Sequence, residues 1–147
     1  MSEEAIIYDF VSKWVSLAKE YLADAPDVRA LYLYGSHERL GRSEQIYSAP
    51  LYDQGGIIRL PGDVTGTDSS IAIQRQVLTL MNDDLAEATS AFDAAGIPAP
   101  TEYRVYYELP TGKLDVQLSR ETRFLGNDDL IQADGVELWL GDRAPRR

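Results

Sequence analysis

The chain has 147 residues, with 24 acidic against 14 basic side chains and a net charge of −10 at neutral pH. Its length predicts a single domain, which we place at residues 1–141, followed by a frayed tail at 142–147. A surface this acidic repels the phosphates of nucleic acids and anionic membranes and attracts basic partners. Acidity also serves simply to keep a protein soluble, which is the more frequent explanation, so the charge alone does not name a partner.

Cysteine is absent, which excludes disulfides, thiolate metal sites and a cysteine nucleophile. No apolar run approaches the ~20 residues that a membrane-spanning helix needs. The opening MSEEAIIYDF is acidic where a secretory signal would be basic. We therefore expect a cytoplasmic protein.

Apolar residues recur at three- and four-residue spacing from residue 3 to residue 23, which predicts an amphipathic helix. Glu3 and Glu4 lie in its first turn, where carboxylates complement the helix dipole. The helix is expected to end before Pro26, because proline disfavours helical geometry in the residue that precedes it.

Residues 28–34 are rich in Val, Leu and Tyr and predict a first strand. We expect this strand to end at the dipeptide Gly35-Ser36. The polar run 37–44 then predicts a turn or loop before the next strand.

A second strand is expected at 45–52, where Pro50 indicates an edge position or a bulge. A turn leads to a short third strand at 57–60, and the clearest loop of the chain follows at 61–70.

A long second helix is expected to begin after the N-cap candidates at 68–70 and to run to about Ala95, with Gly96 ending it. The alternation at 103–109 and 114–118 predicts a hairpin. Residues 136–140 fit either a short strand or a helical turn.

This order of elements predicts an α+β fold. Two helices that cover one face of an antiparallel sheet would bury both amphipathic stripes, which gives a two-layer sandwich.

The segment LYLYGSHERLGRSEQIY resembles the opening of a nucleotidyltransferase active site, where a Gly-Ser turn precedes two metal-binding carboxylates one residue apart. Glu44 takes the place of the first carboxylate, but Ile46 occupies the second position and cannot hold Mg²⁺. Asp115 could imitate a third carboxylate of that family, although an alternating strand often carries one Asp by chance. At most, this pattern indicates a degenerate nucleotide-binding domain.

Other catalytic patterns are weaker still. His37 is the only histidine, and it is expected on the surface without a nucleophile motif beside it. The glycines between residues 55 and 66 lack the spacing of a phosphate-binding loop. The sequence therefore predicts no enzyme, no metal site and no cofactor.

Nine tyrosines are many for this length, and most are expected on strands. A sheet face that combines tyrosines with carboxylates suits a basic protein partner, because tyrosine gives a large rigid contact area with a polar tip. A solvated face with ordinary cross-strand pairs is the alternative. The candidate partner-binding residues are Tyr32, Tyr34, Glu38, Tyr52, Asp53, Tyr106, Glu108 and Asp115.

Three segments carry a resemblance that spans nearly the whole chain: ALYLYGS after the first helix, EYRVYYELPTGKLDVQLSRE in the hairpin, and GVELWLGD near the end. With the order of elements, they resemble the YezG-like immunity proteins, small acidic bacterial proteins that neutralise the toxin domain encoded beside them. The resemblance implies stoichiometric inhibition of a cognate toxin, often a basic nuclease. The alternatives are a general protein-interaction adaptor and the degenerate nucleotidyltransferase-like domain.

Overall fold

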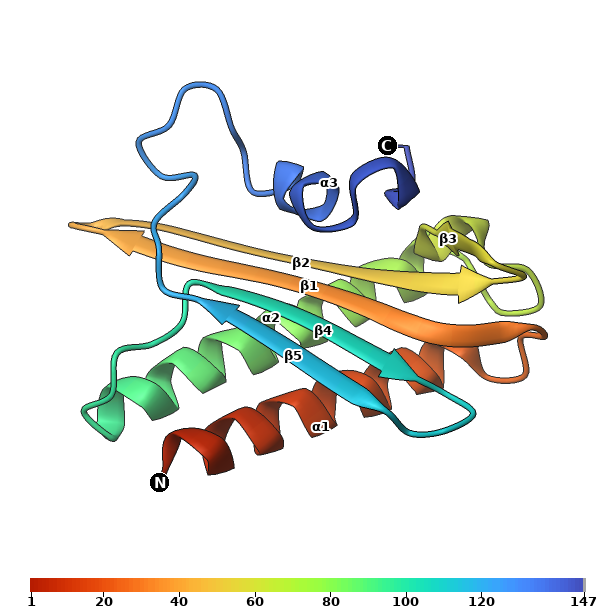
Figure 1. Ribbon diagram of the computed structural model, residues 1–147, viewed down its shortest axis with the longest axis horizontal. Helices are drawn as coiled ribbons and strands as arrows, with labels where there is room; N and C mark the ends of the chain where they lie inside the picture. The colour runs from red at the N-terminus through yellow and green to blue at the C-terminus, as the bar shows by residue number, and fades with distance from the viewer. Residues whose placement is uncertain (147) are drawn as a thin grey trace.

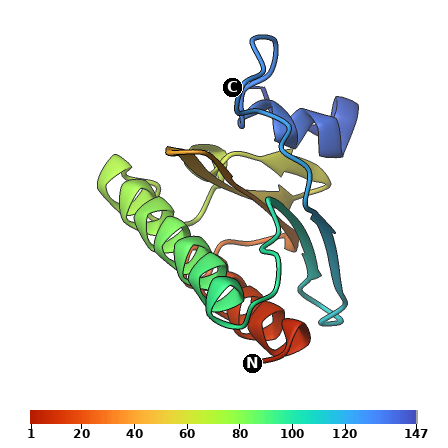
Figure 2. The same ribbon diagram turned by 90° about the vertical axis from the view of Figure 1, so that its left-hand side faces the viewer.

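The computed structural model describes residues 1–146, which contain a five-stranded antiparallel sheet in the order β3–β2–β1–β4–β5 (Figure 1). The strands are β1 (Val28–Leu40), β2 (Ser43–Gln54), β3 (Ile57–Arg59), β4 (Glu102–Glu108) and β5 (Leu114–Ser119). Helices α1 (Glu3–Leu22) and α2 (Ile71–Ala94) cover one face, and the short helix α3 (Asp134–Leu140) lies against the other (Figure 2). The predicted α+β fold, with two helices on one face of an antiparallel sheet, is confirmed.

Helix α1 packs its apolar stripe on the sheet, as the spacing of its apolar residues predicts. The Ser2 hydroxyl caps its start by accepting a 3.1 Å hydrogen bond from the backbone N–H of Ala5. Trp14 is fully buried, and its indole Nε1 donates to the carbonyl of Met81 in α2 at 3.0 Å. This bond satisfies the polar atom of the indole and ties the two helices together.

Gly35 in β1 lies directly against the ring of Trp14. A Cβ at this position would collide with Cη2 of Trp14. We therefore predict that Gly35→Ala lowers the free energy of unfolding by about 1–3 kcal/mol through overpacking. Gly62→Ala is the control, because its Cβ would meet only the end of the flexible Gln74 side chain, at 3.3 Å. Urea unfolding followed by circular dichroism measures both variants, and equal midpoints would contradict the prediction.

Strand β1 is longer than its apolar residues indicate. The prediction that it ends at Gly35-Ser36 is wrong, because β1 continues to Leu40. The predicted loop at 37–44 shrinks to a two-residue turn at Gly41-Arg42, where Gly41 has a φ of +61° and suits the first position of a type II′ turn. The polar residues stay in the sheet because distant segments supply their hydrogen-bond partners, as described below.

Strand β2 runs beside the whole of β1, but only Tyr52, Asp53 and Gln54 pair with β3. In the part of the chain that the structure describes, no strand lies on the outer side of β2 before Tyr52. Pro50 lies in the part of β2 that pairs with β1 on one side only, so the edge position that it indicates is confirmed. The short third strand is confirmed as well. A 3₁₀ turn, Pro61–Asp63, then leads towards α2.

The next elements follow the sequence prediction closely. The Ser70 hydroxyl caps α2 by accepting from the N–H of Ile73, and Gly96, with a φ of +70°, follows the helix. Strands β4 and β5 form the predicted hairpin. None of the helices within residues 1–146 is long and apolar enough to cross a membrane.

The chain after β5 crosses over the sheet face opposite α1 and α2. Of the two structures that fit 136–140, the helical one is found, as α3. Gly135 lets α3 approach the sheet, because a Cβ there would collide with the Tyr34 ring and hydroxyl. The predicted tail at 142–147 begins within a 3₁₀ turn, Gly141–Arg143, and Ala144 packs against an apolar cluster that includes Tyr32, Tyr34 and Val136. Arg147 lies outside the described residues.

Candidate partner-binding site

Most of the candidate partner-binding residues share the sheet face on which α3 lies. Strand alternation and register place seven of them there: Tyr32, Tyr34, Glu38, Asp53, Tyr106, Glu108 and Asp115. Tyr52 points the opposite way, into the core beneath α1 and α2. The structure therefore gathers most of the predicted set on one face, but the segment after β5 covers part of it.

Burial divides this set. Tyr34, Glu38 and Tyr52 are at most 1% exposed and Tyr32 is 8% exposed, so in this structure a partner cannot contact the first three side chains. The side chains that remain accessible are those of Asp53, Tyr106, Glu108 and Asp115.

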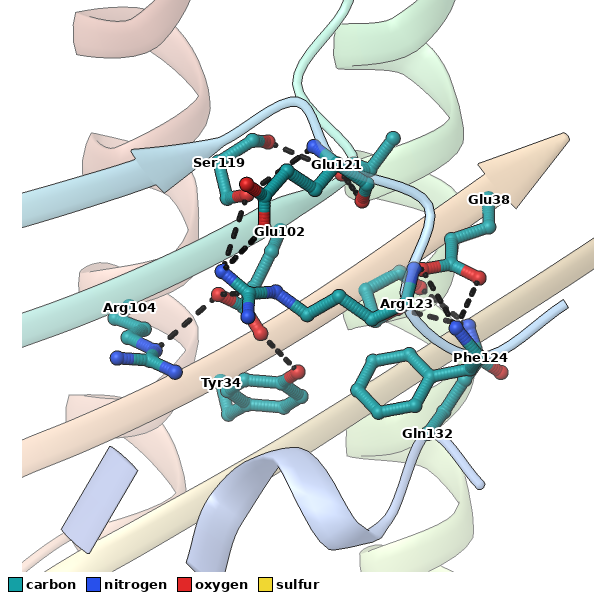
Figure 3. A network of polar contacts seen from close by, with 11 residues as sticks. Tyr34, Glu38, Glu102, Arg104, Ser119, Glu121, Arg123, Phe124 and Gln132 are labelled. Atoms are coloured by element: carbon teal, nitrogen blue, oxygen red, sulfur yellow. Dashed lines mark hydrogen bonds and ion pairs between the residues drawn. The ribbon is translucent and has the colours of Figure 1, made fainter. Parts of the chain in front are cut away.

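Glu38 holds the segment after β5 to the sheet (Figure 3). Its carboxylate accepts hydrogen bonds from three consecutive backbone N–H groups: Arg123 at 2.7 Å, Phe124 at 3.0 Å and Leu125 at 2.8 Å. Consecutive N–H groups that converge in this way form an anion-binding nest. Here the protein's own carboxylate fills the nest, so Glu38 has a structural role in this conformation.

A second buried carboxylate lies beside the same segment (Figure 3). Glu102 accepts a 2.6 Å hydrogen bond from the Tyr34 hydroxyl, and its Oε1 lies 3.3 Å from Nε of Arg104 and 3.8 Å from Nε of Arg123. Burial, and then the bond to Glu102, raise the pKa of Tyr34 well above its ordinary value. The side chain of Gln132 adds a further tie by donating to the carbonyl of Ser36 at 3.2 Å.

His37 is buried, at 5% exposure, so the prediction of a surface histidine is wrong. Its Nδ1 lies 2.8 Å from the hydroxyl of Thr89 in α2, and its Nε2 lies 2.5 Å from Oε1 of Glu44. Both ring nitrogens are therefore engaged with side chains of this chain. The contact between His37 and Thr89 connects the β1–β2 hairpin to α2.

The nucleotidyltransferase pattern does not have its geometry here. Gly35 and Ser36 lie within β1 and not in a turn, and Glu44 is bound to His37. Within residues 1–146, no group of three or more His, Asp or Glu side chains is placed to hold a metal ion.

The accessible part of the predicted surface is a small polar cluster on β4 and β5. The Tyr106 hydroxyl donates to Glu108 Oε2 at 3.0 Å, and burial followed by this bond raises the pKa of Tyr106 to about 12. Glu108 also accepts from the Thr111 hydroxyl at 2.8 Å, and these two bonds hold the pKa of Glu108 below its usual value. Glu108 therefore remains charged at neutral pH, and Asp115 lies opposite Tyr106 on β5.

A further surface, which the sequence patterns do not single out, is the outer edge of β2. Residues 44 and 45 of this edge are exposed and residues 46 and 47 half-buried, whereas residues 48–51 are buried. We call the outward-facing backbone groups of Glu44, Ile46, Ser48 and Pro50 the free edge. In a two-residue hairpin the residues that flank the turn form a hydrogen-bonded pair. Ser43 flanks the turn to β1, so its backbone groups face β1 and those of Glu44 face outward. The same alternation turns the backbone groups of Ile46 and Ser48 outward.

The pairing at the other end of β2 independently indicates the same residues as those whose backbone groups face away from β1. Gln54 flanks the two-residue turn into β3, so its backbone groups face the outer side, and the even-numbered residues before it do likewise. Pro50 thus occupies an outward position, where its missing N–H breaks no bond to β1. On its outer side the free edge thus has three N–H groups and four C=O groups, of which those of Ser48 and Pro50 belong to residues that are buried in this structure.

Two cavities border the free edge, one on each side of the sheet. The larger, of about 560 Å³, lies between β2 and α3 and includes Glu137 and Asp142 in its lining. The smaller, of about 250 Å³, lies between β2 and α2, where Val77 and Leu78 line it. The consecutive residues 47–51 all line the smaller cavity, although their side chains alternate between faces. This cavity therefore follows the edge of the strand itself.

No protein-family model matches the chain, and no curated protein matches it either.

Proposed function

We propose that this protein is a small acidic immunity protein that neutralises a cognate bacterial toxin in the cytoplasm by direct binding. The partner is a basic protein domain. The action is stoichiometric: the bound protein covers or distorts the toxin's active site, and no reaction or cofactor is involved.

The observation that carries the proposal is the charge of the two segments that border the free edge. Residues 126–142, which include α3, contain five carboxylates and neither Lys nor Arg. Helix α2 has one cation, Arg75, against four carboxylates: Asp83, Asp84, Glu87 and Asp93. Opposite charge attracts a basic protein, accelerates the encounter and disfavours acidic competitors.

The resemblance to the YezG-like immunity proteins supports the same proposal. It rests on the order helix, aromatic strand, further strands, long acidic helix, hairpin and Trp-containing closing segment. The chain has these elements in this order, with Trp139 in α3 as the closing tryptophan.

A pull-down with the tagged full chain from a lysate of its source organism, at low and at high salt, tests the proposal. We expect one basic protein to be retained at low salt and largely lost at high salt, because screening weakens attraction between exposed charges. Expression of that protein alone should arrest the growth of a host, and co-expression of this chain should restore growth.

Three outcomes would overturn immunity. If toxicity persists when this chain is co-expressed, the captured protein is not neutralised. If several non-toxic proteins are captured with similar strength, the adaptor alternative is favoured. If no basic partner is found and the purified chain binds nucleotide with Mg²⁺, the nucleotidyltransferase-like alternative is favoured.

A further inference from the structure

We propose that the free edge of β2 receives an extended segment of the basic partner as an additional strand of the sheet, with apolar and cationic side chains alternating along that segment. The identity of the partner rests on the proposed function. The edge itself can be tested without it.

The backbone of the free edge is suited to strand addition. Outward N–H groups of Glu44, Ile46 and Ser48, and outward C=O groups of these residues and Pro50, can form a ladder with an incoming strand. Strand β3 already occupies the edge from Tyr52 onward, so the added strand lies end to end with β3. This limits the paired segment to about seven residues.

The two cavities define the side chains of the incoming strand. Successive side chains of a strand point to opposite faces, so every second one enters the same cavity. Val77 and Leu78 in the smaller cavity suit apolar side chains. Glu137 and Asp142 in the larger cavity suit Lys or Arg, and they outnumber the one cation among the described residues that line it, Arg146.

A second copy of this chain is disfavoured as the occupant. Pairing two free edges would bring the acidic residues 126–142 of both copies together, and like charges that face one another are destabilising. The extended segment of a different protein would place its cationic side chains beside the carboxylates of the larger cavity and its apolar side chains in the smaller cavity.

Strand addition is tested by nuclear magnetic resonance of the labelled full chain, with a capped peptide of alternating lysine and valine, about nine residues long, as the probe. We expect saturable shifts of the amide signals of Glu44, Ile46 and Ser48, and unchanged signals in β5. A peptide of the same composition with all lysines grouped at one end should bind about tenfold more weakly, because it cannot fill both cavities. Shifts that map to β5, or equal binding of the grouped peptide, would overturn the proposal.

N-methylated peptides separate strand pairing from simple charge attraction. One version carries methyl groups on the backbone nitrogens of the valines, and the other on those of the lysines. Because alternate residues direct their N–H groups to the same edge of a strand, each version lacks backbone N–H donors along one edge of the peptide. Only one version should keep its affinity, and which one does so gives the direction of the added strand. Equal binding of both would mean that the peptide rests on the acidic surface without pairing, and would overturn the proposal.

Matched double variants test the charges of the larger cavity. Glu137→Gln with Asp142→Asn should weaken binding of the alternating peptide by about tenfold. Glu20→Gln with Asp24→Asn removes the same charge from exposed positions in and after α1 and should change binding less than about twofold. Equal effects would overturn the proposal. So would edge amide signals that depend on protein concentration without peptide, because a second copy would then occupy the edge.

The outcomes also separate this inference from the proposed function. If a toxin binds the Glu137/Asp142 double variant as tightly as the unchanged protein, the immunity proposal holds but the toxin does not bind at the free edge. If the peptide binds at the edge but the pull-down finds no toxic partner, the strand-addition site is supported and the immunity proposal fails.

Discussion

Glu38→Gln is expected to lower the free energy of unfolding by about 3 kcal/mol and to loosen the segment after β5. The carboxylate is 1% exposed and accepts from the backbone N–H groups of Arg123, Phe124 and Leu125. A glutamine amide keeps the shape but loses the charge, and its NH₂ group would face donors instead of accepting from them. At least one buried N–H is then left without a partner.

Urea unfolding gives the loss of stability, and hydrogen exchange at the amides of Phe124 and Leu125 reports the loosening directly. Glu121→Gln is the matched control: its carboxylate belongs to the same segment and lies 3.3 Å from Nη2 of Arg123, but its side chain is 74% exposed. Exposed ion pairs contribute little, so we expect a change below about 0.5 kcal/mol. A Glu38→Gln variant as stable as this control would contradict the structural role of Glu38.

Raising the pH above 10 is expected to unfold the protein steeply. Burial raises the pKa values of Tyr34, Tyr52 and Tyr103 above the ordinary value of 10.0. The folded state keeps these protons at a pH where the unfolded state releases them. Stability is therefore full below pH 10 and falls as the pH rises beyond it. Each tyrosine removes about 1.4 kcal/mol per pH unit, and the three together about 4 kcal/mol, against a typical total of about 5–15 kcal/mol.

Tyr52→Phe isolates one of these contributions. The Tyr52 hydroxyl is buried and has no hydrogen-bond partner among residues 1–146. Its removal should leave stability at neutral pH unchanged or higher, because an unsatisfied polar group leaves the core. The loss of stability per pH unit above pH 10 should fall by about a third. Urea unfolding at a series of pH values measures this slope, and a slope equal to that of the unchanged protein would contradict the assignment.

Local signals explain why much of the fold could be predicted. The two long helices have regular apolar spacing and recognisable ends, such as the Ser70 cap and Gly96 after α2. The β4–β5 hairpin alternates clearly between apolar and polar residues. These patterns depend on residues close together in the chain, so one sequence is enough to detect them.

The continuation of β1 could not be predicted in this way. The polar residues 36–38 resemble a loop, and their place in a strand depends on partners far away along the chain. Thr89 is 52 positions from His37, and Arg123 is 85 positions from Glu38. Tertiary contacts of this range override local preference.

The candidate site was predictable only in part. Alternation placed Tyr106, Glu108 and Asp115 on one face, but it could not show that α3, only seven residues long, covers Tyr34. Gly135 was the available signal for this close approach, and its meaning depends on a residue of another element. The free edge exists because β3 pairs with only the last three residues of β2. Pro50 indicates an edge position, but it does not establish how far β3 extends.

The layer formed after β5 also has a consequence for synthesis on the ribosome. Tyr32 and Tyr34 are translated before residues 120–146, the segment that covers them in the folded protein. At about 5–20 residues per second, the nascent chain carries this aromatic face uncovered for a few seconds after β5 is complete. Chains released before that point would display it permanently, and we expect them to be preferred substrates of chaperones and proteases.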